Sequence, residues 1–388
     1  MTESSTPIVI VAYNRPKSLL RLLKSLEIAH YPKDKVELII SIDFSTNNNK
    51  VIEIANDFVW HFGTKKVVLH KENLGLKKHI LLCGDYALSY GNVIILEDDL
   101  YVSTNFYYYA LKALKFSVNK DYIGGISLYN HKINVHTKEY FSALEDGYDN
   151  WYFQFASSWG QAWTKQQWEN FKEWYSKETI VLKSPKIPKN VSNWSDKSWL
   201  KYFIVFLIET ERYFSYPKIS LTSNFSDQGT HVGNDSTAYQ SELLYAKKEN
   251  YNFASITETK AVYDAFYESL YLINFLGYTK DTIEIDCYGY KPIGNKKFLL
   301  TSKILNYKII NSVSRSLKPI ETNFIANITG AELFVYDLES IEKNKISNTT
   351  YLKYRRLIYS IKLINTKAII LLLKKLSKDK IKRLHKIN

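Results

Sequence analysis

Short apolar runs alternate with helical segments over the first hundred residues, and this alternation restricts the chain to one class of fold. The segments that show it, strand and helix in turn, are 8–12, 17–29, 36–42, 51–62, 66–70, 77–89 and 93–96. A repeated β-α-β order is typical of a mostly parallel sheet with helices on both faces. We therefore predict an α/β fold.

The last of these strands ends in three adjacent carboxylates, Glu97, Asp98 and Asp99. Clustered carboxylates repel one another and lose solvation on burial, so a cation is expected beside them. Oxygen ligands of this kind suit Mn²⁺ or Mg²⁺. Because ligands bind beyond the carboxyl ends of strands in open α/β sheets, Asn14, Asp43 and Asp99 are expected at one edge. The alternative is an acidic turn that faces solvent.

The excess positive charge of the chain lies in residues 343–388. The formal net charge is +13, and 14 of the 52 Lys and Arg residues, but only one of the 39 Asp and Glu residues, fall there. The balanced remainder argues against a basic nucleic-acid groove, and no specific nucleic-acid partner is expected. An apolar helical stripe in this tail comprises Leu357, Ile361, Ile364, Ala368 and Leu371.

A basic amphipathic helix of this kind is typical of proteins that bind an anionic membrane surface. The alternatives are a helix packed on the body of the protein, or a tail that binds nucleic acid non-specifically. The chain opens with polar residues, shows no signal peptide, and has no apolar run of about 18–20 residues, the length of a transmembrane helix. We therefore expect a cytoplasmic protein, peripheral on the cytoplasmic face of the inner membrane.

Two cysteines, Cys83 and Cys287, are the only ones in the chain. They exclude a disulfide framework and a cysteine-based zinc site, and they favour a reducing compartment.

Three short motifs near the start of the chain resemble those of bacterial family-2-like glycosyltransferases, which are inverting enzymes of the GT-A fold. They are Val-Ala-Tyr-Asn-Arg-Pro (11–16), Ser-Ile-Asp (41–43) and Asn-Leu-Gly (73–75). Glu-Asp-Asp-Leu (97–100) resembles the metal motif of the Golgi N-acetylglucosaminyltransferases that begin complex N-glycans. The resemblance implies a nucleotide-diphospho-sugar transferase fold, Rossmann-like, with a mostly parallel sheet.

Later motifs follow in the order of the same Golgi family. They are a Trp-flanked aspartate in Trp194–Trp199, the segment Tyr216–Ser220, and the Gly-Thr-His sequence at 229–231. The likeness covers about residues 7–240.

The resemblance implies roles for the carboxylates. Asp99 is expected to bind the Mn²⁺ or Mg²⁺ that bridges the donor diphosphate, and Glu97 and Asp98 to hold ribose and donor-sugar hydroxyls. Asp196 is expected to be the general base, with a pKa raised by its flanking tryptophans. The alternatives are Glu145, Asp146 or Asp149 as the base, and an N-cap role for Ser195 or Asp196.

Further residues are expected to contact the donor or the acceptor. Those assigned to the donor are Ala12, Tyr13, Asn14 and Arg15 in the nucleotide pocket, Asp43 on the uracil, Lys77 or Lys78 on a phosphate, and His231 in a loop, 226–235, that closes over the diphosphate. Trp159 and Trp163 are expected to stack on the acceptor sugar. Each of these predictions has an alternative. Arg15 and the lysines could be surface charges, residues 226–235 could be an ordinary surface loop, and the tryptophans could be core residues.

We predict three regions: a GT-A domain at 1–245, a small α+β region at 246–342, and the basic amphipathic tail at 343–388. The predicted activity is metal-dependent, inverting transfer of N-acetylglucosamine or another hexose from a UDP-sugar. The acceptor would be a glycan, expected to be lipid-linked, in bacterial surface polysaccharide synthesis. The alternatives are a sugar nucleotidyltransferase, whose usual Gly-rich phosphate loop is not found after the first strand, and a non-catalytic sugar- or membrane-binding protein.

Overall fold

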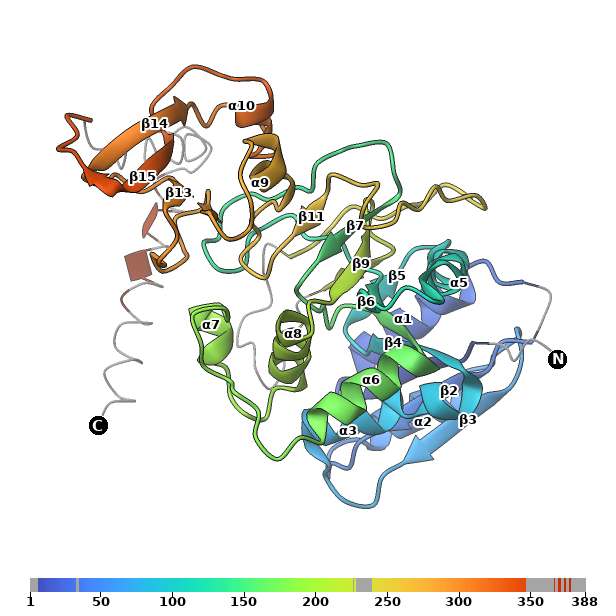
Figure 1. The fold of residues 1–388 in the computed structure, drawn as a ribbon. Coiled ribbons are helices and arrows are strands. Elements are labelled where there is room, and N and C mark those ends of the chain that lie inside the picture. The colour runs from blue at the N-terminus through green and yellow to red at the C-terminus, as the bar shows by residue number, and fades with distance from the viewer. Residues whose placement is uncertain are drawn as a thin grey trace, which may run out of the picture.

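A nine-stranded sheet forms the body of the protein (Figure 1). The computed structural model describes residues 6–32, 35–225, 227 and 239–346, together with positions 366, 369–370, 373–374 and 377 of the tail. The strand order is β11-β7-β9-β6-β8-β4-β1-β2-β3.

The first half of the sheet is parallel, as predicted. Its elements in chain order are β1 (Ile8–Ala12), α1 (Pro16–Glu27), β2 (Leu38–Ile42), α2 (Asn49–Asp57), β3 (Lys65–Leu69), α3 (Gly75–Gly84), α4 (Tyr86–Tyr90) and β4 (Asn92–Glu97). Strand β1 lies between β2 and β4 and is parallel to both. The helix predicted at 77–89 is in fact two helices, α3 and α4.

The second half of the sheet is mixed. Its elements are α5 (Phe106–Ser117), β6 (Ile123–Ser127), β7 (Asn150–Phe153), β8 (Gln161–Thr164), α6 (Lys165–Tyr175), α7 (Lys189–Ser192), α8 (Trp199–Glu209), β9 (Tyr213–Pro217) and β11 (Val262–Tyr263). Strand β8 is antiparallel to β4 and β6, whereas β9 is parallel to β6. After β9 ends at Pro217, the short strand β10 (Thr222–Asn224) begins at Thr222.

Side chains of β1 alternate between two cores, because successive residues of a strand point to opposite faces. Ile8 and Ile10 pack with residues of α1 and α5, and Val9 and Val11 pack with residues of α3, α6 and α8. Helices therefore cover both faces, as predicted. Most of the aromatic residues between 150 and 174 are core residues, including Trp163, which is fully buried.

Two smaller sheets complete the described structure. Strand β5 (Leu100–Val102) pairs with β10 in an antiparallel ribbon. A four-stranded sheet lies beside the body (Figure 1). It contains β12 (Ile283–Asp286), β13 (Phe298–Thr301), β14 (Tyr307–Val313) and β15 (Leu333–Ile341), accompanied by α9 (Tyr271–Phe275) and α10 (Thr322–Ile325). Because β11 pairs with β7, the main sheet continues beyond the boundary predicted at 245/246.

The apolar stripe predicted in the tail lies outside the described residues, and so does most of the loop 226–235. The described positions between 366 and 377 are helical, and Ile369, Ile370 and Leu373 among them are exposed. Within the described part of the chain, no helix has the length and apolar character needed to cross a membrane.

Candidate active site

The ends of three parallel strands meet at one edge of the sheet. The backbone N–H of Asp43, after β2, donates to the carbonyl of Ala12 at the end of β1 (3.0 Å). The N–H of Asp98, after β4, donates to the carbonyl of Val11 (3.1 Å). These two bonds bring the residues that follow β1, β2 and β4 together, as predicted from the strand order.

Arg15 lies against the acidic cluster, Glu97, Asp98 and Asp99. Its guanidinium donates to Asp99 Oδ2 at 2.9 Å and to Asp98 Oδ1. Arg15 directly precedes α1, whose first residue is Pro16, a favoured residue at this position. The alternative of a free surface charge is wrong for Arg15, because the side chain is mostly buried and paired with two carboxylates.

Each carboxylate of the acidic cluster keeps one buried oxygen without a partner among the described residues: Glu97 Oε1, Asp98 Oδ2 and Asp99 Oδ1. Burial raises the pKa of Glu97 to about 8, and the Asp99 charge adds to this effect. Burial also raises the pKa of Asp98 to about 6, against the opposing effect of Arg15. One guanidinium is therefore too little positive charge for three buried carboxylates.

A divalent cation would supply the missing positive charge, provided that a bound diphosphate completes its coordination. The described residues contain no group of three or more His, Cys, Asp or Glu side chains arranged to hold a metal ion by themselves. Mg²⁺ commonly binds through one or two carboxylates, with substrate phosphates and water completing its coordination. The unpartnered oxygens thus suit an ion shared with a bound diphosphate.

Asp43 anchors the turn that leads into α3. Its buried carboxylate accepts the backbone N–H groups of Phe44 (2.8 Å), Leu74 (2.8 Å) and Gly75 (3.0 Å). Gly75 has a φ of +72°, a conformation that glycine adopts without strain. The structure therefore gives Asp43 an anchoring role, and its contact with uracil stays a prediction.

The neighbours of Arg15 after β1 differ in exposure. Ala12 is buried, Tyr13 is half-buried and Asn14 is exposed. A hydrogen bond from the Tyr13 backbone lowers the Asp98 pKa, although the net shift is upward. These residues border the acidic cluster, and their contacts with a nucleotide stay predictions.

Asp196 lies just before α8 with its side chain 76% exposed. Lys201 pairs with its carboxylate at 2.8 Å and lowers its pKa. The predicted upward shift is therefore wrong: Trp199 turns into the core, Trp194 is only half-buried, and neither removes Asp196 from water. The N-cap alternative is wrong as well, because Ser198 caps α8 by accepting the Lys201 N–H.

Lys77 links α3 to the segment before α8. Its ammonium donates to the carbonyl of Asp196 (2.8 Å) and lies 4.7 Å from the ring centroid of Tyr202. Since α3 begins at the turn held by Asp43, this contact places Asp196 at the same edge of the sheet as the acidic cluster. The predicted contact of Lys77 with a phosphate requires this hydrogen bond to open, and it stays a prediction.

The alternative bases have other partners. Asp146 pairs with Lys218 (3.1 Å) and accepts from Thr259, and Asp149 pairs with Lys248. Glu145 is exposed. His231 lies outside the described residues.

Residues 8–171 match the model of glycosyl transferase family 2. The matched segment runs from β1 into α6 and contains the acidic cluster, Arg15 and Asp43. The mostly parallel sheet with helices on both faces is a GT-A fold. A search of curated proteins found no match.

Among solved structures, S. aureus TarS 1–349 in complex with UDP-GlcNAc is 14% identical, with a TM-score of 0.40. The match covers 60% of this chain and 62% of that one, so it spans about three fifths of the TarS structure. The mannosyltransferase PcManGT from Pyrobaculum calidifontis, in complex with GDP-Man and Mn²⁺, is 17% identical with a TM-score of 0.31, over 45% of this chain and 48% of that one.

The two tryptophans predicted to stack on an acceptor have different positions. Trp163 lies fully buried in the core beneath the main sheet, so that prediction is wrong for it. Trp159 is half-buried, with its ring centroid 4.7 Å from that of Tyr129 and 5.1 Å from that of Tyr239. Its contact with a sugar stays a prediction.

Sequence reasoning identified neither the partners of Arg15 nor Lys201. Arg15 is predicted in the nucleotide pocket, but its pairs with Asp98 and Asp99 join positions far apart in sequence and were not expected. Lys201 follows Asp196 by five residues, and Asp196 lies before α8 rather than on it. This is outside the i+3 and i+4 spacings of helix pairs, so the sequence carries no signal for this partner.

Proposed function

We propose that this protein is a metal-dependent, inverting glycosyltransferase that moves a sugar from a UDP-sugar to a glycan acceptor. One observation carries the proposal: the acidic cluster at the end of β4 holds three unpartnered carboxylate oxygens beside a single arginine. The match of residues 8–171 to glycosyl transferase family 2 supports the reaction class.

The acidic cluster would hold the donor together with a divalent cation. Asp99 is the proposed ligand, because it has an unpartnered oxygen and its side chain is more exposed than that of Asp98, the other carboxylate that Arg15 contacts. A bound Mn²⁺ or Mg²⁺ would supply Lewis-acid stabilisation of the departing diphosphate. Glu97 and Asp98 would accept hydrogen bonds from donor hydroxyls, and Arg15 is placed to orient the two aspartates.

Asp196 is the proposed general base. Its carboxylate is open to solvent and is held at one side by Lys201. The lowered pKa keeps it ionised near neutral pH, so it is in the form that accepts a proton from the acceptor hydroxyl. Inversion requires such a base on the face of the sugar opposite the leaving diphosphate.

The donor and acceptor complete the proposal. N-acetylglucosamine or another hexose would come from the UDP-sugar, and the acceptor would be a lipid-linked glycan of the bacterial surface. The basic tail supports a position at the cytoplasmic face of the inner membrane, because each basic residue near an anionic surface contributes about 1 kcal/mol. Co-sedimentation with anionic vesicles, lost at high salt and absent with neutral vesicles, would support this location.

Calorimetric titration of UDP with and without Mn²⁺ tests the donor site. We expect binding that requires Mn²⁺ and weakens by about 10- to 100-fold in Asp99→Asn, since a charged contact contributes about 1.5–3 kcal/mol. Asp281→Asn, at an exposed position of the C-terminal region, is the matched control and should bind as the wild type does. Equal affinity in all three proteins would contradict the assignment of Asp99.

A panel of UDP-sugars, followed by NMR of the anomeric proton of the product, tests the reaction. Asp196→Asn should keep UDP binding and lose transfer. Transfer with retained anomeric configuration, or near-normal turnover in Asp196→Asn, would contradict the proposed mechanism. Release of pyrophosphate from a nucleoside triphosphate and a sugar phosphate would instead identify a nucleotidyltransferase.

A further inference from the structure

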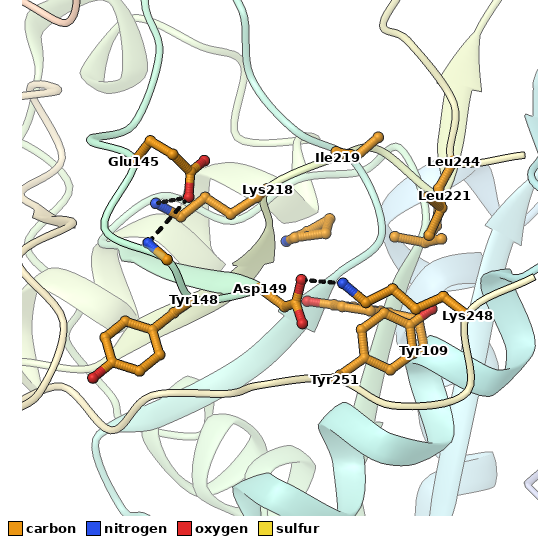
Figure 2. Close-up of a pocket in the computed structure, with 12 residues that line it drawn as sticks. Tyr109, Glu145, Tyr148, Asp149, Lys218, Ile219, Leu221, Leu244, Lys248 and Tyr251 are labelled. Atoms are coloured by element: carbon orange, nitrogen blue, oxygen red, sulfur yellow. Dashed lines mark hydrogen bonds and ion pairs between the residues drawn. The ribbon is translucent and has the colours of Figure 1, made fainter. Parts of the chain in front are cut away.

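A cavity of about 270 Å³ lies beyond the carboxyl end of β9 (Figure 2). Its walls come from four parts of the chain: residues 145–149, residues 217–221, the first turn of α5, and the segment 244–251. No residue of the acidic cluster lines it, and β5 leads from that cluster toward it. The cavity is therefore separate from the proposed donor site.

Tyr109 contributes a buried hydroxyl to this cavity. The residue is 1% exposed, and its hydroxyl has no hydrogen-bond partner among the described residues. The hydroxyl lies near Tyr251 and Asp149, which also line the cavity (Figure 2). A buried hydroxyl without a partner is uncommon in a native protein, so a ligand or water is expected to satisfy it.

The charges around the cavity cancel. Lys248 pairs with Asp149, and Lys218 lies 4.0 Å from Glu145 (Figure 2). Lys218 also pairs with Asp146 at 3.1 Å behind the wall. Each cation thus has a carboxylate partner within the wall. A phosphate or a metal ion would have to break such a pair, whereas a neutral polar ligand would not.

The remaining wall is amphipathic. Leu221 and Leu244 supply aliphatic surface. The ring of Tyr251 stacks on Phe253 and lies under the ammonium of Lys248. Tyr148 lines the cavity as well, and its ring contacts no other aromatic ring among the described residues. Tyrosine combines an apolar face with a polar tip, which matches a sugar ring with its C–H face and hydroxyl edge.

The size of the cavity limits the ligand. At about 270 Å³ it lies just below the range of about 300–1,000 Å³ typical of pockets for drug-sized molecules. A single sugar ring is of the right scale, whereas a nucleotide is not.

We propose that this cavity, the Tyr109 pocket, binds one neutral sugar unit of the acceptor glycan at a distance from the reacting hydroxyl. The sugar would accept or donate a hydrogen bond at the Tyr109 hydroxyl and lie against the ring of Tyr148. The assignment of this sugar to an acceptor glycan rests on the proposed function. The binding of a sugar in the pocket is independent of it.

Saturation-transfer NMR with free neutral monosaccharides and disaccharides tests the pocket, in the absence of nucleotide. We expect at least one sugar to bind the wild type, and Tyr109→Phe to weaken it by about 3- to 10-fold, the effect of one hydrogen bond. Tyr148→Ala should weaken it by about tenfold or more. Tyr107→Phe is the matched control, because its hydroxyl is on the same helix but donates to the carbonyl of Thr6 (2.7 Å), away from the pocket.

Binding lost in both pocket variants and kept in Tyr107→Phe would support the proposal. No binding by any sugar, or equal binding by all variants, would overturn it. Loss in Tyr107→Phe equal to that in Tyr109→Phe would also overturn it, since the effect would then come from the helix. Sugar binding in a protein that fails to bind UDP would leave the pocket in place and contradict the proposed function alone.

Discussion

Two groups of buried carboxylates in this protein have opposite surroundings. In the acidic cluster, three carboxylates share Arg15 and keep three buried oxygens without partners. In the C-terminal region, Asp264, Glu268, Glu284 and Asp286 surround Lys291, and we call this group the Lys291 cluster. Lys291 pairs with Asp264 (2.5 Å) and Glu284 (2.6 Å), and none of the four carboxylates has a buried unpartnered oxygen.

The Lys291 cluster is satisfied by the protein itself. Glu268 accepts the backbone N–H groups of Cys287 and Tyr288, and Asp286 accepts from the Lys291 N–H and pairs with Lys303 (2.9 Å). Burial alone therefore does not separate a functional carboxylate from a structural one. What separates them is whether the chain supplies every partner, and of these two groups only the acidic cluster keeps buried oxygens without one.

Lys291→Met should produce the largest effect. It leaves buried carboxylates without their shared cation, which typically costs about 3–5 kcal/mol of unfolding free energy. Urea denaturation measures the loss. Lys296→Met is the control: Lys296 pairs with Glu284 at 2.9 Å but is a third exposed, so a loss within about 1 kcal/mol is expected. Equal losses in the two variants would remove the structural role given to the Lys291 cluster.

Glu321 is a third kind of buried carboxylate, with the Tyr263 hydroxyl as a donor, and burial raises its pKa to about 7. Since the folded pKa lies above the ordinary 4.5, its contribution to stability is full below about pH 4.5 and is lost as the pH rises through 7. Glu321→Gln should remove a pH dependence on the order of 3 kcal/mol from urea denaturation curves. Glu339→Gln, 64% exposed, should leave the dependence unchanged. An unaltered slope in Glu321→Gln would contradict the shifted pKa.

Asp99→Asn and Asp286→Asn should have opposite effects on stability and on UDP binding. Asp99→Asn should change the unfolding free energy by no more than about 1 kcal/mol, because it relieves repulsion within the acidic cluster while weakening one ion pair. It should nevertheless weaken Mn²⁺-dependent UDP binding by about 10- to 100-fold. Asp286→Asn should cost about 1–3 kcal/mol and leave UDP binding intact. Denaturation and calorimetry on the same samples check both. A destabilised Asp99→Asn would make the acidic cluster structural.

Lys201→Met should have the smallest effect. Without Lys201 the pKa of Asp196 rises toward its ordinary value, so the acid limb of the pH–rate profile moves to higher pH. The shift should be small because the Asp196 side chain is exposed to water. Sugar-transfer rates between pH 4 and 8 measure it, and Lys197→Met, on the exposed segment beside Asp196, is the control. If the acid limb of the pH–rate profile stayed in place in Lys201→Met, another group would be the base.

Local patterns predicted the first half of the sheet well. Strands β1 to β4 and their helices follow from apolar periodicity, and their parallel order brings Asp43 and Asp99 to one edge. The mixed half could not be ordered in this way, because β7 and β9 pair across long connections that periodicity does not constrain. Sequence also misjudged the environment of Asp196, since the direction taken by Trp199 depends on packing against β8 and α6.

The partners of the site residues were the least predictable part. Arg15 and Asp98 are 83 positions apart, and Lys77 meets Asp196 across 119 positions. Motifs identified the residues, but only the folded chain shows that Asp43 is fully engaged with backbone N–H groups while Glu97 retains a buried oxygen without a partner.

The Arg15 pairs have a consequence for how metal binding would be measured. A cation that binds the unpartnered Asp99 Oδ1 would lie close to the guanidinium on Oδ2, so the two positive charges would repel each other. This repulsion would weaken binding of the ion alone, and binding would improve when a diphosphate brings negative charge that both the ion and Arg15 can contact. Metal and nucleotide would each appear weak when titrated singly and tight when titrated together.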